Sequence, residues 1–128
     1  MHKIVLCGSK KFIPKFLELE KALNDKGYEV VVPREFIIDI PKKEASILHF
    51  SEIEKDDVDA LLIVNESKNG LDNYIGANGF AELAFGFYKN KKVFLLNDVY
   101  MPYEEEITAW DIIPLKGNID NLAIYLNK

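Results

Sequence analysis

The chain has 128 residues, of which 48% are hydrophobic and 29% charged, and its 16 basic and 21 acidic side chains give a net charge of -5. This size and composition are typical of one globular domain, which we expect to cover residues 1–128, and not of a disordered chain. The acidic balance argues against a nucleic-acid polymer or an anionic membrane as the main partner, because both bind basic faces. A small phosphorylated ligand, which needs only a few local donors, stays compatible with it.

No segment is predicted to cross a membrane or to direct secretion. No apolar window approaches the roughly 18 residues that a spanning helix needs, and the apolar run at residues 4–7 is too short for a signal sequence. The single cysteine cannot form an internal disulfide, and no zinc-type spacing of Cys and His is visible. We therefore expect a cytoplasmic protein.

Strands and helices are predicted to alternate along the chain. Short apolar runs indicate strands at residues 3–7, 28–32, 59–64, 92–96 and 112–115. Helical spacing indicates helices at residues 12–26, 44–57, 77–90, 103–111 and 118–126. Gly27 is the expected stop of the first helix, residues 34–44 are expected to be irregular, and Pro114 marks the last strand as an edge strand.

This alternation predicts an α/β fold. Nearly continuous apolar strands are typical of a parallel sheet that helices cover on both faces, joined by right-handed crossovers. We predict a flavodoxin-like three-layer fold with a parallel sheet of about five strands in the order 2-1-3-4-5. Ligands of such sheets bind at the carboxyl ends of the strands, where strand order reverses. The predicted loops at that edge are residues 8–11, 33–43, 65–79 and 97–103.

The most informative residue is Glu82, the only carboxylate between Ile75 and Lys92. It falls inside a predicted helix that a glycine-bearing loop opens. The side chains three or four positions away are small, amide or aromatic: Asn78, Gly79, Phe85 and Gly86. This pattern leaves room for a ligand and predicts a reactive carboxylate, with Asn78 among the substrate contacts. An ordinary carboxylate on the helix surface is the alternative.

Other candidate binding residues follow the first and third predicted strands. Gly8, Ser9 and Lys10 precede a helix, where backbone N–H groups, a hydroxyl and an ammonium group can hold a phosphate. A plain turn with solvated lysines fits the same residues. Asp72 either caps the local backbone or orients a sugar hydroxyl, and Tyr74 could stack on a base.

Further candidates lie at the start of the third predicted helix, after the fourth strand, in the second helix and at the end of the first strand. Gly76 and Gly79 allow a ligand to approach the helix N-terminus, where an anion is favoured. Asn97 follows the fourth strand at the same edge, although turn formation explains it more simply. His49 is expected on the surface of its helix or half-buried, with a ligand contact as the alternative. Cys7 is expected to be a small buried residue.

Four segments together resemble the nucleoside 2-deoxyribosyltransferase superfamily, which includes the 2'-deoxynucleoside 5'-phosphate N-hydrolases. They are Gly8-Ser9, DALLIV at residues 59–64, GANGFAELAFG at residues 76–86 and KKVFLL at residues 91–96. The resemblance implies that Glu82 attacks the anomeric carbon and displaces the base. The glycosyl-enzyme then resolves to water or to another base without a metal or other cofactor. Gly8 and Ser9 match the loop near the sugar phosphate, and Asp72 matches an aspartate that precedes the glutamate.

The expected function is therefore cleavage or exchange of the N-glycosidic bond of a (deoxy)nucleoside or nucleoside monophosphate. Glu82 is the expected nucleophile, Asp72 and His49 are the supporting catalytic candidates, and the partner is a small molecule. A non-catalytic nucleotide-binding or sensor domain on the same fold is the alternative. Two departures from the superfamily favour it. The serine that binds phosphate ahead of the glutamate in the hydrolases has no match here. In place of the aspartate that helps the base to leave in many members, His49 is the nearest polar residue.

A homodimer or higher homo-oligomer is also expected. Four aromatic residues in one predicted helix exceed what a single sheet contact needs: Phe80, Phe85, Phe87 and Tyr88. The choice of base, of sugar, of a 5'-phosphate and of water or a second base as acceptor stays open at this stage.

Overall fold

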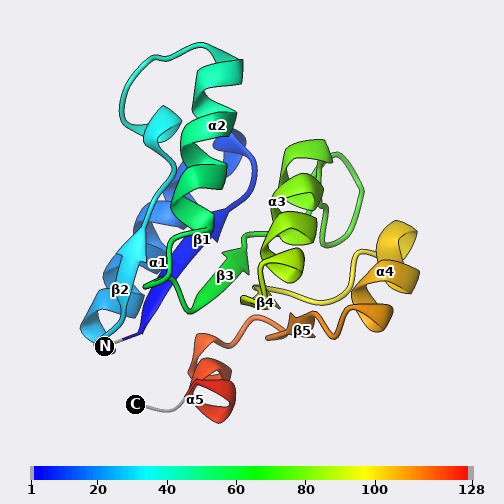
Figure 1. Ribbon diagram of the computed structural model, residues 1–128. Coiled ribbons are helices and arrows are strands. Elements are labelled where there is room, and N and C mark those ends of the chain that lie inside the picture. Colours follow the sequence, from blue (N-terminus) through cyan, green and yellow to red (C-terminus); the bar gives the residue numbers. More distant parts are fainter. Residues whose placement is uncertain (1, 127–128) are drawn as a thin grey trace.

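The fold is a three-layer α/β arrangement around one parallel sheet (Figure 1). The computed structural model describes residues 2–126. The strands are β1 (Lys3–Cys7), β2 (Glu29–Val31), β3 (Ala60–Ile63), β4 (Lys92–Leu95) and β5 (Ile113–Pro114). They pair in the order β2-β1-β3-β4-β5, and every pairing is parallel. The predicted class, strand number and strand order are confirmed.

Within the described residues, five α-helices connect or follow the strands. They are α1 (Ile13–Asp25), α2 (Lys42–Ile53), α3 (Ala77–Tyr88), α4 (Glu104–Ala109) and α5 (Leu122–Tyr125). Single 3₁₀ turns precede most of them: η1 (Lys10–Phe12), η2 (Arg34–Phe36), η3 (Met101–Tyr103) and η4 (Ile119–Asn121). None of the helices within residues 2–126 is long and apolar enough to span a bilayer.

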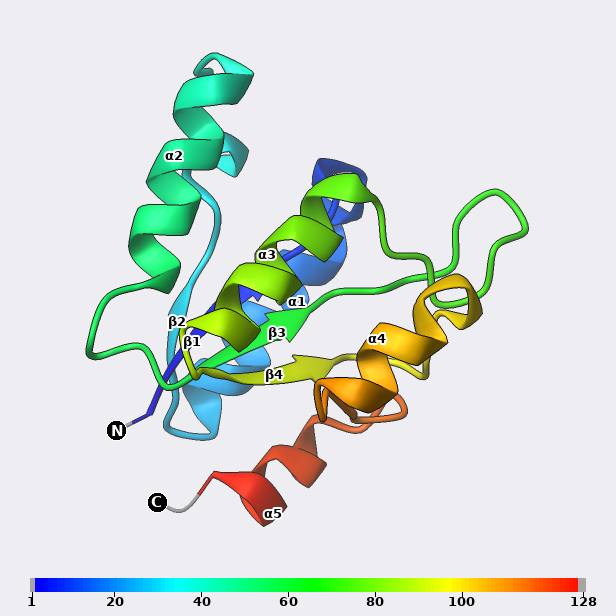
Figure 2. The ribbon, with the colours of Figure 1, turned by 45° about the vertical axis from the view of Figure 1, so that its right-hand side comes forward.

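The strands alternate their side chains between two apolar clusters, because successive residues of a strand point to opposite faces. Ile4 and Leu6 pack with α1 and α5, whereas Val5 and Cys7 pack with α2, α3 and α4. Figure 2 shows α3 on one side of the sheet and α1 on the other. Burial on both faces explains why the strands are nearly continuous in apolar residues.

The predicted boundaries fail most at the last helix. Residues 118–126 form a 3₁₀ turn that Asn118 caps, followed by the four-residue helix α5. The second helix is also shifted, since it begins directly after Pro41 and ends at Ile53, before the acidic turn. Proline is well suited to the start of a helix and poorly suited to its interior, which explains this beginning. Gly27, with a φ of 93°, follows the end of α1 as predicted.

Two glycines bring the elements around the candidate site close together. Gly8 has a φ of 146°, and a Cβ there would lie 3.1 Å from the Val64 carbonyl oxygen. A Cβ on Gly86 would lie 2.6 Å from Cδ2 of Leu61, so only glycine lets α3 pack this closely on β3. Glu82 lies one helical turn before Gly86, and α3 therefore holds it close to the sheet.

Candidate active site

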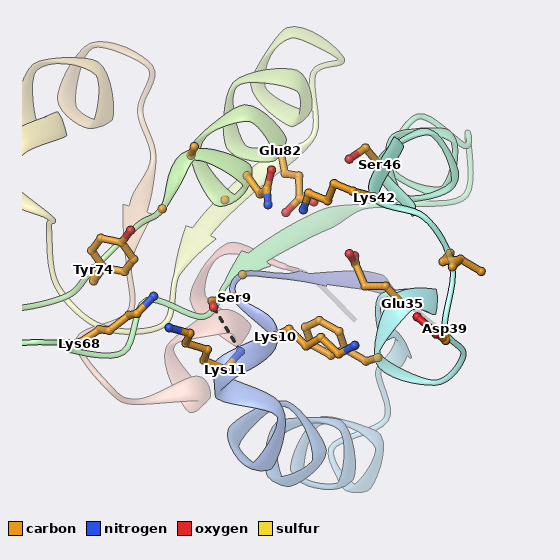
Figure 3. Close-up of a pocket in the computed structure, with 17 residues that line it drawn as sticks. Ser9, Lys10, Lys11, Glu35, Asp39, Lys42, Ser46, Lys68, Tyr74 and Glu82 are labelled. Carbon is orange, nitrogen blue, oxygen red and sulfur yellow. Dashed lines mark hydrogen bonds between the residues drawn. The ribbon is translucent and has the colours of Figure 1, made fainter. Parts of the chain in front are cut away.

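A pocket of about 490 Å³ lies at the carboxyl ends of the central strands, between α3, the loop after β1 and the segment that joins β2 to α2 (Figure 3). It lies at the edge that the sequence predicted for a ligand. The structure brings together eight of the predicted site residues in its lining: Gly8, Ser9, Lys10, Tyr74, Gly76, Asn78, Gly79 and Glu82. This volume is in the range of small-molecule sites.

Glu82 forms part of the pocket wall and is 9% exposed. Its Oε1 atom is buried and has no hydrogen-bond partner within the described residues, while Oε2 lies 3.4 Å from Nε2 of His49. Burial, to which the nearby Glu35 carboxylate adds, raises the pKa of Glu82 to about 8. The side chain is therefore mostly uncharged at neutral pH.

His49 lies behind Glu82 and is 4% exposed, which corrects the expectation of a surface or half-buried histidine. Burial lowers its pKa to about 4, so the ring is neutral at pH 7. The contact between His49 and Glu82 is thus one between two mostly uncharged groups at pH 7 and not an ion pair. Periodicity gave no sign of this burial, because the apolar Ile47 and Leu48 of α2 are 56% and 40% exposed, whereas Ala45, His49 and Ile53 are its buried residues.

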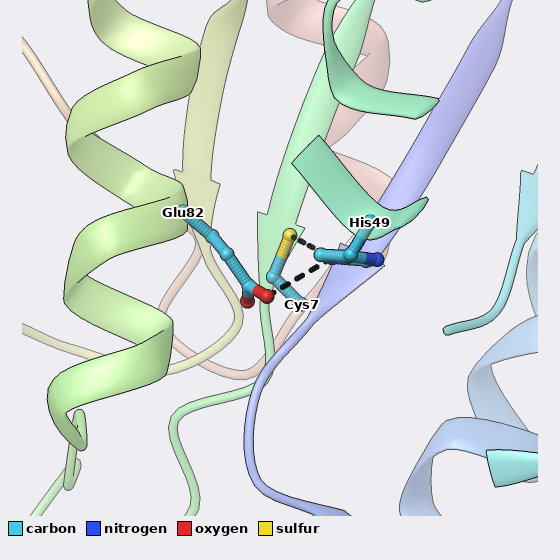
Figure 4. Close-up of side chains that lie close together, drawn as sticks. All are labelled: Cys7, His49 and Glu82. Carbon is cyan, nitrogen blue, oxygen red and sulfur yellow. Dashed lines mark hydrogen bonds and ion pairs between the residues drawn. The ribbon is translucent and has the colours of Figure 1, made fainter. Parts of the chain in front are cut away.

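Cys7 completes a cluster with these two residues at the end of β1 (Figure 4). Its Sγ atom lies 3.4 Å from Nε2 of His49, and it is fully buried, as predicted. Burial, to which the Glu82 carboxyl adds, raises the pKa of the Cys7 thiol well above its ordinary value. Cys7, His49 and Glu82 are the one group of three or more His, Cys, Asp or Glu donors within residues 2–126 whose ligand atoms lie close enough for a metal, within 4.8 Å of one another.

The pocket has a basic end beside η1. Lys11 and Lys68 lie on the same side of it as Ser9 and Tyr74 (Figure 3). The Ser9 hydroxyl accepts a hydrogen bond from the Lys11 backbone N–H at 3.2 Å, and this contact caps η1. The pKa of Lys68 is lowered, mainly by desolvation and next by the charge of Lys11, because the two ammonium groups repel each other. An anion between them would remove this repulsion.

The opposite end of the pocket is built from the segment that joins β2 to α2 and from the beginning of α2. Glu35, Asp39, Lys42 and Ser46 lie there in Figure 3. The apolar residues Phe36 and Ile40 also line the pocket. None of these residues was predicted individually as a contact. The available signal for Glu35, Asp39 and Lys42 was their place in the loop at residues 33–43, which was assigned to the same sheet edge, whereas Ser46 falls in the second predicted helix.

Asp72 and Asn97 lie outside this pocket. Asp72 is exposed and lines a separate depression with residues 98–102, because the turn at Asn69 and Gly70 carries the loop away from Glu82. The Asn97 side chain donates to the Asn65 carbonyl oxygen at 3.1 Å and to Glu66 Oε2 at 2.6 Å. It joins the loops that follow β3 and β4, so neither residue is placed to contact a ligand at Glu82.

The fold and the pocket together define a three-layer α/β protein with a ligand-sized site at the strand switch. Among solved structures, the fold is similar to that of the CMP N-glycosidase BcmB from Clostridium botulinum, with a TM-score of 0.68. The similarity covers 97% of this chain and 99% of that chain, at 16% sequence identity, and therefore concerns the fold. No protein-family model and no curated protein matches the sequence.

Proposed function

We propose that this protein cleaves the N-glycosidic bond of a nucleoside monophosphate, with Glu82 as the nucleophile. The observation that carries the proposal is a buried carboxyl group in the wall of a pocket whose other end is basic, with one carboxyl oxygen that has no hydrogen-bond partner among residues 2–126. The similarity to the fold of a CMP N-glycosidase adds support for the reaction class.

In the proposed reaction, the ionised Glu82 carboxylate attacks C1' of the sugar. The C1'–O bond to the enzyme forms as the C1'–N bond breaks, and the base leaves with the bonding electrons and takes up a proton from solvent. Water then attacks C1', the C1'–O bond to Glu82 breaks, and the proton that the water loses returns to solvent, which releases the sugar phosphate and regenerates the carboxylate. A second base in place of this water would give exchange instead of hydrolysis.

The charges in the pocket set the orientation of the substrate in this proposal. The phosphate lies between Lys11 and Lys68, near the start of η1, where Ser9 is available as a further donor. The sugar lies beside Glu82, and the base extends toward Phe36 and the neighbouring acidic side chains. Carboxylates such as Glu35 accept hydrogen bonds from amino groups, which favours a base with an exocyclic amine.

Replacement of Glu82 by glutamine tests the nucleophile. We expect Glu82→Gln to lower the rate of base release from nucleoside monophosphates by at least about 1,000-fold, because an amide cannot form the ester intermediate. Free base is quantified by chromatography across the common nucleotides. The matched control is Glu105→Gln on the exposed surface of α4, which should keep wild-type turnover. Equal base release by Glu82→Gln and the wild type would refute the assignment.

Replacement of Lys68 tests the phosphate end. Loss of one charge-assisted hydrogen bond costs about 1.5–3 kcal/mol, so we expect Lys68→Met to raise KM for a nucleoside monophosphate by roughly 10- to 100-fold. Turnover of the corresponding nucleoside, which lacks the phosphate, should not change. Lys21→Met, on the exposed surface of α1, is the control. A uniform loss for both substrates would argue against a phosphate at this position.

A nucleotide-binding domain without catalysis is the second candidate. The observation that favours it is the raised pKa of Glu82, because the uncharged carboxyl is a poor nucleophile. Calorimetric titration of nucleoside monophosphates separates the two candidates. Tight binding without base release between pH 7 and about 9 would select the binding domain.

A further inference from the structure

Three different metal-binding donors meet behind the pocket wall. The Cys7 thiol comes from the end of β1, the His49 imidazole from α2 and the Glu82 carboxyl from α3 (Figure 4). The proposed glycosidic reaction uses the carboxyl and assigns no part to the thiol. All three residues are buried, so the cluster differs from an exposed group of acidic side chains.

Two of the three donor separations are close to those around a tetrahedral zinc ion. Zn–N and Zn–O distances of about 2.1 Å and a Zn–S distance of about 2.3 Å place N and O about 3.4 Å apart, and N and S about 3.6 Å apart. His49 Nε2 lies 3.4 Å from Glu82 Oε2 and 3.4 Å from Cys7 Sγ. All three donor atoms lie within 4.8 Å of one another, so His49 is the donor that brings the other two to one point.

Charge also favours a divalent ion at this point. A thiolate and a carboxylate carry two negative charges, so a divalent cation gives a neutral centre, the form that burial penalises least. Binding releases the thiol and carboxyl protons to solvent. The Glu82 Oε1 atom, buried without a hydrogen-bond partner within the described residues, is an additional oxygen that an ion or its water could satisfy.

We propose that Cys7, His49 and Glu82 form a binding site for Zn²⁺ or for a chemically similar divalent ion such as Co²⁺. Mixed sulfur, nitrogen and oxygen donors suit these ions and disfavour Mg²⁺ and Ca²⁺, which prefer oxygen ligands. Glu82 also lines the pocket, so an ion held by this cluster would lie next to the space where a ligand would bind. A bound ion holds the carboxylate that the proposed reaction needs, and metal and nucleotide would therefore compete.

Cobalt spectroscopy tests the site without any nucleotide. Tag-free protein is stripped with a chelator under reducing conditions, the chelator is removed, and Co²⁺ is added. We expect a near-ultraviolet thiolate-to-cobalt charge-transfer band that saturates at one ion per chain and disappears when Zn²⁺ displaces the cobalt. Because no substrate is present, the result does not depend on whether the protein cleaves a glycosidic bond.

Variants assign the ligands. Cys7→Ser should abolish the band, and His49→Gln and Glu82→Gln should each weaken Zn²⁺ binding by about 100-fold or more, since even outer-shell changes cost up to that much. His2→Gln is the matched control, because His2 is the other histidine of the chain. Circular dichroism establishes whether each variant is folded. If Cys7→Ser does not fold, the two glutamine variants still test the site.

Three results would overturn the proposal. They are a wild-type protein with no charge-transfer band, a band that persists in folded Cys7→Ser, and an equal loss of Zn²⁺ affinity in His2→Gln and His49→Gln.

Discussion

The pKa of Glu82 is about 8 because the carboxyl group is buried in the pocket wall and because the charge of Glu35 lies nearby. The ionised form that the proposed reaction needs is therefore a minority at neutral pH. We expect kcat/KM to rise about tenfold per pH unit between pH 6.5 and 7.5 and to level off above pH 8. The measurement is base release in buffer that contains a chelator, so that no metal ion occupies the carboxylate.

The Glu35→Gln variant is an internal control for this pH profile. Removal of its negative charge should move the midpoint to lower pH, because Glu35 contributes to the raised pKa of Glu82. A flat profile between pH 6 and 8 would mean that the reacting group has the pKa of an ordinary carboxylate.

At the residue level, the location of a side chain in the pocket could be predicted where the signal is local, while its role stays a proposal. Glu82 is the lone carboxylate of a helix that follows a glycine loop, and periodicity is enough to single it out. Lys68 lies in a loop and Glu35 in the single turn η2, neither of which has a periodic pattern, so their approach to the pocket depends on tertiary structure. The contact of Cys7 with His49 spans 42 residues and has no sequence signature.

At the level of elements, the fit of α3 against β3 depends on Gly86. A Cβ at this position would lie 2.6 Å from Leu61, whose side chain is fully buried. Overpacking of this kind costs about 1–3 kcal/mol, which exceeds the gain of about 1 kcal/mol from the better helix propensity of alanine. We expect Gly86→Ala to lower the free energy of unfolding by roughly 1 kcal/mol, measured by urea denaturation.

A double-mutant cycle with Leu61→Val checks the cause. The smaller side chain makes room for the added methyl group, so Gly86→Ala should cost less in that background than in the wild type. An equal cost in both backgrounds would place the effect elsewhere than at this contact.

Helix prediction was reliable where the apolar face is long. The amphipathic pattern of α1 and the apolar face of α3 extend over three turns, and both elements are close to their predicted limits. In the last segment, one Asn caps a 3₁₀ turn and only Leu122 and Leu126 are buried, which is too little to define a long helix. Local capping decided the structure there.

At the level of the whole molecule, Glu82 and His49 make stability depend on pH in opposite directions. The folded state raises the pKa of Glu82 from 4.5 to about 8, so stability falls as pH rises through that interval. It lowers the pKa of His49 from 6.5 to about 4, so stability rises with pH between those values. The effects oppose each other up to pH 6.5, and only that of Glu82 remains above it.

We therefore expect the metal-free protein to lose roughly 2 kcal/mol of unfolding free energy between pH 6.5 and 8, at about 1.4 kcal/mol per pH unit. Glu82→Gln should lack this loss, since an amide does not titrate. Urea denaturation with a chelator present measures both proteins. The same decline in Glu82→Gln would show that another group is responsible.

The strand order was predictable from the whole chain because parallel strands joined by helices admit few topologies. Four aromatic residues of α3 are the basis on which self-association is predicted. Two of them, Phe80 and Phe85, contact other aromatic residues of the same chain and so do not need a partner chain to cover them. Phe80 packs against Tyr103 and Trp110, and Phe85 packs against Phe50. Phe87 and Tyr88 stay 40% and 76% exposed, and a homo-oligomer stays a prediction.

The two outermost strands bear on how copies of the chain can meet. β2 has three residues and β5 has two, one of which is Pro114. Edge strands this short offer few unpaired backbone N–H and C=O groups to the strand of another molecule, and proline has no backbone N–H to donate. Pairing of edge strands between molecules into a continuous sheet is therefore disfavoured. This protects a concentrated solution against fibre growth. Any ordered assembly would then form through the helical surfaces.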